Sequence, residues 1–178
     1  MSGIIQILDL KFQPYISALE IDKSVGEIAK KIDNDYEGKT PLFICVLNGS
    51  FIFASDLLKK VSVPCSIEFV RLKSYEGTSS TEKVREVLGL NCDIKGRDII
   101  IIEDIVDTGH TLAHFFDYLK AFEPRSVKLT SLIFKKEAFK KDFKIDYLGF
   151  EIENKFIVGY GLDYNEYGRN LDAIYQLV

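Results

Sequence analysis

The sequence is poor in cysteine, and its few cysteines do not form a metal-binding or disulfide pattern. Cys45, Cys65 and Cys92 are an odd number, and no two of them make a C-x-x-C pair. A structural zinc site or a disulfide framework is therefore not expected. Cys45 and Cys65 lie in apolar runs, which predicts that both are small buried core residues in a protein of a reducing compartment.

The sequence also lacks a basic surplus, a first segment with signal-peptide features and a long apolar run. Its 178 residues include 23 Lys and Arg against 27 Asp and Glu, a formal net charge of −4, which argues against a general nucleic-acid-binding protein. The first ten residues have no basic start followed by an apolar stretch, as a signal peptide would. No apolar run approaches the roughly 20 residues that span a bilayer. We expect a cytoplasmic protein without nucleic-acid or membrane partners.

The composition that remains is typical of one globular domain over residues 1–178, with 47% hydrophobic residues and neither a repeat nor a low-complexity linker. Buried strands are predicted at 41–47, 65–72, 97–104 and 126–134, and helices at 22–35, 50–61 and 109–122. Ser24 and Glu27 match an S-x-x-E capping box for the first helix. The aromatic and glycine-rich tail predicts short strands and turns. Alternating strands and helices indicate an α/β fold with a mostly parallel sheet.

The stretch "IIIIEDIVDTGHT" at 99–111 combines a buried strand with a cluster of acids. Four isoleucines predict a strand that is covered on both faces. Glu103, Asp104 and Asp107 follow within five positions, where ligands bind in parallel sheets. Crowded carboxylates repel one another, so a ligand is expected to accompany them. Carboxylates accept hydrogen bonds from sugar hydroxyls and bind Mg²⁺.

The residues after these acids favour an anion. Thr108, Gly109 and Thr111 lie near the start of the predicted helix, where free backbone amides and the helix dipole attract phosphate. Carboxylates beside a phosphate site suit a phosphorylated ribose. An alternative is that Asp107 or Thr108 only caps the helix, but a cap does not explain the two acids that end the buried strand.

The 99–111 stretch closely resembles the phosphoribosyl-pyrophosphate motif of the type I phosphoribosyltransferases. From about residue 40 onward, "VLNGSFIFASDL", "EFVRLKSYEG", "LIFKK" and "GFEIENKFIVGYGLDYNEYGRNL" resemble segments of hypoxanthine-guanine phosphoribosyltransferases, in the same order. The resemblance implies the type I phosphoribosyltransferase fold, with a mostly parallel sheet flanked by helices. It also implies a small hood over the base site, formed by about 1–15 and 145–178.

The resemblance implies a purine-salvage enzyme, a pentosyl transferase that uses Mg²⁺. It would transfer phosphoribosyl from phosphoribosyl pyrophosphate to N9 of hypoxanthine or guanine, giving IMP or GMP and pyrophosphate. Its partners would be these small molecules, and it would assemble as a homodimer or homotetramer. Lys135 would donate to the purine 6-oxo group, and because lysine has no acceptor, adenine is disfavoured. Xanthine stays open as a substrate.

The resemblance also assigns the remaining residues. The phosphoribosyl pyrophosphate contacts would come from Glu103, Asp104, Asp107, Thr108, Gly109, His110, Thr111, Asn48, Gly49 and Arg169. Asp107 would additionally be the general base or acid at purine N7. Glu103, Asp104 and Asp163 would bind Mg²⁺, Phe156 would stack on the purine, and the backbone of Ile157 would read its edge, all beside Lys135. Ser74 and Tyr75 would belong to a mobile loop at about 73–86 that closes over the site.

Two residues depart from the family pattern, and other functions fit less well. Asn48 and His110 stand where the family often has a basic residue. A kinase-type phosphate loop is missing, and "GYGLDY" has Tyr164 where a dinucleotide-binding motif needs glycine. The remaining alternative is a regulator of the same fold that binds nucleic acid without turnover, but the acidic charge and Asp107 argue against it.

Overall fold

The computed structural model describes residues 3–73, 85–90 and 92–178, which form a large and a small sheet. The large sheet has the strand order β5-β4-β3-β6-β7-β8. Its strands are β3 (Leu42–Leu47), β4 (Ser66–Lys73), β5 (Arg85–Leu88), β6 (Asp98–Val106), β7 (Ser126–Lys135) and β8 (Tyr147–Ile152). Every neighbouring pair is parallel except β5 with β4. The predicted mostly parallel sheet is confirmed, while the antiparallel edge strand β5 was not predicted.

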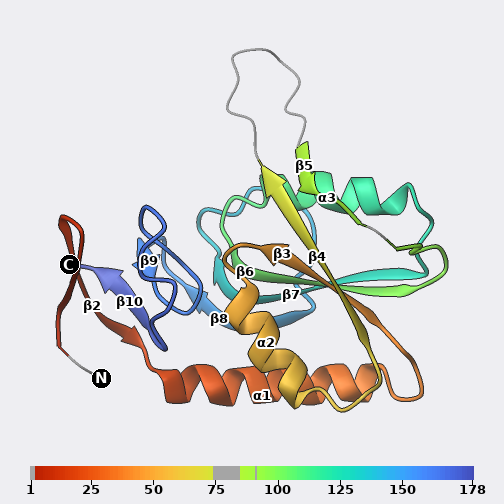
Figure 1. The fold of residues 1–178 in the computed structure, drawn as a ribbon, viewed down its shortest axis with the longest axis horizontal. Helices are drawn as coiled ribbons and strands as arrows, with labels where there is room; N and C mark the ends of the chain where they lie inside the picture. The colour runs from red at the N-terminus through yellow and green to blue at the C-terminus, as the bar shows by residue number, and fades with distance from the viewer. Residues whose placement is uncertain (1–2, 74–84, 91) are drawn as a thin grey trace.

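Helices cover both faces of this sheet. Helices α1 (Ala18–Asp35) and α2 (Phe51–Lys60) lie on one face and α3 (His110–Lys120) on the other (Figure 1). The isoleucine run of β6 supplies both interfaces, because successive side chains of a strand point to opposite faces. Ile100 and Ile102 belong to the core cluster of α1 and α2, and Ile99 and Ile101 to that of α3.

The start of α1 differs from the prediction. Ser17 is the N-cap, and it forms a reciprocal capping box with Glu20. The helix therefore begins at Ala18, and the predicted capping box of Ser24 and Glu27 is wrong, since both lie inside the helix. Both pairs match S-x-x-E, and the end of the preceding strand decides between them. The buried face of α1 consists of Ile21, Val25, Ile28, Ala29 and Ile32.

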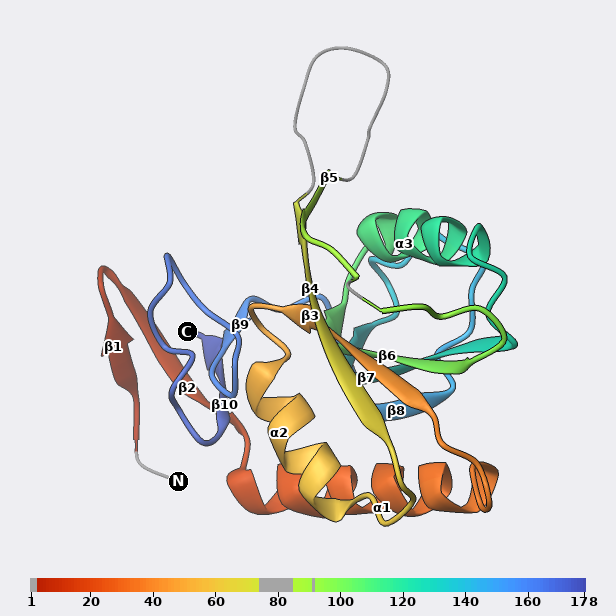
Figure 2. The ribbon, with the colours of Figure 1, turned by 45° about the vertical axis from the view of Figure 1, so that its right-hand side comes forward.

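A small sheet joins the two ends of the chain. Its strand order is β1-β2-β10-β9, with β1 (Ile5–Ile7), β2 (Leu10–Ile16), β9 (Ile157–Val158) and β10 (Ile174–Leu177). It lies beside the α1 and α2 side of the large sheet (Figures 1 and 2). Within the expected hood segment 145–178, β8 belongs to the large sheet, so only the chain after β8 contributes to the small one.

The cysteines separate into different environments. Cys45 is buried in β3, as predicted, and burial raises the pKa of its thiol to about 11. Cys65 is exposed, so the prediction of a core position is wrong for this residue. It lies directly before β4, whose first residue, Ser66, is exposed as well. In the ranges described above, no helix is both long and apolar enough to cross a membrane.

Candidate active site

The carboxyl ends of β3 and β6 bring two predicted segments together. The strands are parallel neighbours with Cys45 beside Ile102, so the residues that follow each strand meet at one edge of the sheet. A Cβ atom added to Gly49 would lie 1.5 Å from Oδ2 of Asp104. No side chain fits between this loop and the carboxylate, which explains the glycine. The preceding Leu47–Asn48 peptide bond is cis.

The two acids that end the isoleucine run lie within β6, which continues to Val106. Asp104 is only 9% exposed, and its pKa is raised to about 6, mainly by burial and also by the charge of Asp163. Burial and the charge of Asp104 raise the pKa of Glu103 well above its usual range. Oε2 of Glu103 is buried and has no hydrogen-bond partner among the described residues. Keeping these two carboxyl groups away from water costs free energy, and hydrogen bonds to a bound ligand can offset that cost.

Asp107 and Lys135 form an ion pair at the same edge. Val106 lies beside Phe134 in the pairing of β6 with β7, so the next residue of each strand also comes close. Nζ of Lys135 donates to Oδ2 of Asp107 at 3.2 Å. The Lys135 side chain is 10% exposed, whereas that of Asp107 is 46% exposed. A buried cation thus holds a carboxylate that is open to a ligand.

The N-cap residue of α3 is Gly109, with φ of +77°, so the helix has no N-cap side chain. The His110 amide donates to Oγ1 of Thr108 at 3.5 Å, whereas Asp107 is paired with Lys135. The alternative in which Asp107 or Thr108 is the N-cap residue is therefore wrong. A Cβ atom on Gly109 would lie 2.7 Å from the ring of Phe139, so the sharp turn needs glycine. Thr108 and His110 are exposed at this helix end, where an anion is favoured.

The C-terminal segment adds a cation to the carboxylate edge. Nη2 of Arg169 pairs with Oδ1 of Asp163 at 2.7 Å, and Nη1 donates to the Gly161 carbonyl at 2.8 Å. A Cβ atom on Gly161 would lie 1.9 Å from the carbonyl oxygen of Gly49. The positive charge of Arg169 lowers the pKa of Asp104 and so offsets part of the rise that burial causes. The Arg169 side chain is therefore held at this edge by a carboxylate and a carbonyl group and is only 24% exposed.

The predicted base-stacking residue lies in an aromatic cluster of the small sheet. The ring centroid of Phe156 lies 6.0 Å from that of Phe12 and 5.9 Å from that of Tyr164. Phe156 is 43% exposed, whereas Phe12 is fully buried. Ile157 is buried in β9. The contact of Phe12 with Phe156 was not predicted, because nothing in the local sequence distinguishes Phe12 from an ordinary core aromatic.

The predicted metal ligands do not form a closed protein cage. In the part of the chain that the structure describes, no three His, Cys, Asp or Glu side chains form a group that could hold a metal ion. Asp163, one of the predicted ligands, is instead paired with Arg169. Ser74 and Tyr75, predicted for the closing loop, lie outside the described residues.

Comparison with known proteins agrees with this geometry. Residues 17–165 match the family model described as a phosphoribosyl transferase domain, which defines the class of the protein. The chain is 37% identical to the hypoxanthine-guanine phosphoribosyltransferase of Aquifex aeolicus, over 97% of this chain and 98% of that protein. It therefore belongs to the hypoxanthine-guanine phosphoribosyltransferase family.

Two other matches define the extent of the similarity. A crystal structure of a hypoxanthine phosphoribosyltransferase from Staphylococcus aureus superposes with a TM-score of 0.90 at 36% identity, covering 96% of this chain and 92% of that one. The bifunctional protein TilS/HprT of Listeria monocytogenes is 40% identical over 89% of this chain. This chain spans only 25% of the length of that bifunctional protein.

Proposed function

We propose that the protein transfers phosphoribosyl from phosphoribosyl pyrophosphate to N9 of hypoxanthine or guanine, in purine salvage. The observation that supports this most directly is the pair of acids on β6 just before the start of α3, where Gly109 is the N-cap. Asp104 is buried, and Glu103 is partly buried with an Oε2 atom that has no hydrogen-bond partner among the described residues. A carboxylate pair beside an anion-binding helix end suits the hydroxyls and phosphate of a phosphorylated ribose. Thr108, Gly109, His110 and Thr111 would then hold the 5-phosphate, with Asp107.

The ion pair of Asp107 and Lys135 supports a 6-oxopurine as acceptor. The bond from N9 to C1 of the ribose forms as the bond from C1 to pyrophosphate breaks, and pyrophosphate leaves with the electron pair. Asp107, 46% exposed, can accept the purine proton at N7. Lysine has three donor hydrogens, so Lys135 can hold Asp107 and donate to the 6-oxo group together. Adenine would leave that donor facing an amino group, which such a site rejects.

The contacts around Arg169 suit the leaving group and Mg²⁺. Arg169 and the backbone of Asn48 and Gly49 would face pyrophosphate. The charge of Asp163 raises the pKa of Asp104, so these carboxylates repel each other in a way that a cation relieves. Mg²⁺ commonly uses one or two carboxylates and completes its shell with phosphate oxygens, so an ion bound here would take at most two of Glu103, Asp104 and Asp163. When bound, it would neutralise charge on the leaving oxygens.

The small sheet would be the hood over the base site. The exposed ring of Phe156 would stack on the purine and the backbone of Ile157 would read its edge. Closure of the segment 73–86, with Ser74 and Tyr75, would exclude water from the reaction. We further propose a single domain, a cytoplasmic location and assembly as a homodimer or homotetramer, which light scattering of the purified protein would test.

An absorbance assay tests the proposed activity. The protein is given phosphoribosyl pyrophosphate and Mg²⁺ with hypoxanthine, guanine, xanthine or adenine in separate reactions, beside Asp107→Asn and a sample with chelator. We expect turnover of hypoxanthine and guanine, no turnover of adenine, and a large loss in both controls. Binding of phosphoribosyl pyrophosphate without turnover of any base would refute the transferase and favour a regulator.

A further inference from the structure

Three consecutive residues of the C-terminal segment have left-handed backbone conformations. The φ angles are +101° at Gly159, +50° at Tyr160 and +100° at Gly161. Glycine adopts such angles readily, whereas a residue with a bulky side chain is strained there. Strain of this kind persists only where surrounding contacts impose it. Tyr160 must therefore be held in place by its neighbours.

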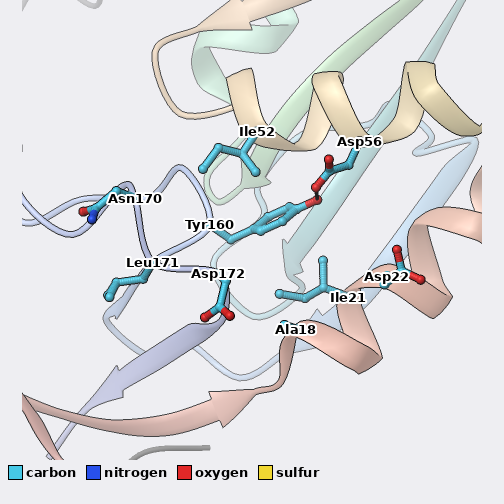
Figure 3. A pocket seen from close by; sticks show the side chains of 9 residues that line it. All are labelled: Ala18, Ile21, Asp22, Ile52, Asp56, Tyr160, Asn170, Leu171 and Asp172. Carbon is cyan, nitrogen blue, oxygen red and sulfur yellow. Dashed lines mark hydrogen bonds between the residues drawn. The ribbon is translucent and has the colours of Figure 1, made fainter.

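The contacts that hold Tyr160 come from α2 and from its own segment. The phenol donates to Oδ2 of Asp56 at 2.8 Å, and the backbone amide donates to the carbonyl of Leu171 at 2.9 Å. Tyr160 is only 5% exposed. The ring crosses from the C-terminal segment to α2, along the wall of a pocket of about 370 Å³ that Ile21 and Asp172 also line (Figure 3).

The hydrogen bond links two parts of the candidate active site through one helix. Helix α2 starts at Phe51, directly after the loop that contains Gly49, and Asp56 lies five residues further along it. At the other partner, the residue after Tyr160 is Gly161, whose α carbon packs against the carbonyl of Gly49. The Gly161 carbonyl accepts a hydrogen bond from Arg169. The loop and the arginine are thus placed relative to each other across this bond.

We propose that Tyr160 and Asp56 are positioning residues for the pyrophosphate side of the site. Their hydrogen bond fixes the 159–161 turn against the loop at Gly49, and through it the place of Arg169. Neither residue contacts the reacting atoms. The proposal rests on the proposed function, because that function makes pyrophosphate the ligand of this loop and of Arg169.

The test compares two tyrosines with the same kind of bond. Tyr160→Phe removes only the hydroxyl that donates to Asp56. Tyr147→Phe is the matched control, because Tyr147 is also buried and donates to Oδ2 of Asp35 at 2.7 Å. Asp35 is the last residue of α1, and Tyr147 is the first of β8, at the amino end of the parallel strands, away from the site. Asp56→Asn keeps a carbonyl acceptor and should behave nearly as the unaltered protein.

We expect Tyr160→Phe to raise the KM for phosphoribosyl pyrophosphate and the inhibition constant of pyrophosphate by roughly fivefold, the effect of losing one ordinary hydrogen bond. The KM for hypoxanthine should change less than about twofold, because the lost hydrogen bond joins the turn to Asp56 of α2 and not to Phe156, Ile157 or Lys135 of the proposed base site. Tyr147→Phe should lower the melting temperature and leave all three constants unchanged. The proposal would be overturned if Tyr160→Phe lowered the melting temperature but left these constants unchanged. It would also be overturned if the KM values for both substrates changed equally.

A separate measurement distinguishes this proposal from the proposed function. If the unaltered protein turns over no purine, the transferase is refuted. The positioning role is then judged by calorimetric binding of pyrophosphate with Mg²⁺ and by hydrogen exchange of the amides at 47–51. Weaker binding and faster exchange in Tyr160→Phe than in Tyr147→Phe would support the role. Equal binding and equal exchange in the two variants would contradict it.

Discussion

The charge of Asp104 should destabilise the ligand-free protein. Its carboxyl group is buried at the end of β6, and burial is the main reason that its pKa rises from 3.8 to about 6. At about 1.4 kcal/mol per pKa unit, this rise amounts to about 3 kcal/mol between the protonated and ionised forms. Asp104→Asn keeps the shape without the charge, and it should raise the free energy of unfolding at pH 7 by about 1–3 kcal/mol.

The direction of the pH dependence follows from the two pKa values. The folded chain holds the Asp104 proton more tightly than the unfolded chain does between about pH 4 and pH 6. Stability therefore falls as the pH rises through this window, and the loss is complete above pH 6. In Asp104→Asn this contribution disappears. The variant should nevertheless bind phosphoribosyl pyrophosphate more weakly, since an amide replaces the proposed ligand-binding carboxylate.

Urea unfolding followed by circular dichroism at pH 4.5 and pH 7 measures the effect. Asp98, at the other end of β6, is the matched control. Burial alone would raise the pKa of Asp98, but hydrogen bonds from Ser126 and Arg125 outweigh it and hold this pKa below the usual value. The charge of Asp98 therefore stabilises the fold above its pKa, and Asp98→Asn should lower the free energy of unfolding at pH 7. Destabilisation by Asp104→Asn at pH 7 would refute the reasoning.

Three further substitutions have defined outcomes. Gly49→Ala would push a methyl group into the Asp104 carboxylate and should lower kcat/KM for phosphoribosyl pyrophosphate about 100-fold; near-normal kinetics would contradict the packing. A Cβ atom added to Gly26, within α1, would lie 4.0 Å from the nearest atom, in Lys60. Gly26→Ala should therefore raise the free energy of unfolding by about 0.5–1 kcal/mol. A lower melting temperature in thermal unfolding would be inconsistent with open space at this position. Lys135→Met should raise the KM for hypoxanthine at least about tenfold, whereas Lys136→Met, whose exposed ion pair with Glu151 contributes little, should not; equal effects would exclude a specific role for Lys135.

The layered fold could be predicted because its signals are local in the chain. A run of four β-branched isoleucines favours a strand covered on both faces, and the structure covers β6 with helices on both sides. The position of the α1 capping box could not be predicted, because Ser17 and Ser24 are equivalent as a pattern. The choice depends on the end of β2 at Ile16, and that end is set by pairing with β10.

The acids, the glycine and the hydroxyl residues of the stretch 99–111 can be read from the chain alone, and they indicate the kind of ligand expected there. Which distant residues come together around that ligand depends on the tertiary structure. Gly49 lies between Asp104 and Gly161, and Phe12 supports Phe156, although these residues are far apart in the chain. Hydrophobic periodicity reports only how a segment divides its own faces between core and solvent, whereas such contacts depend on how sheets and helices pack against one another.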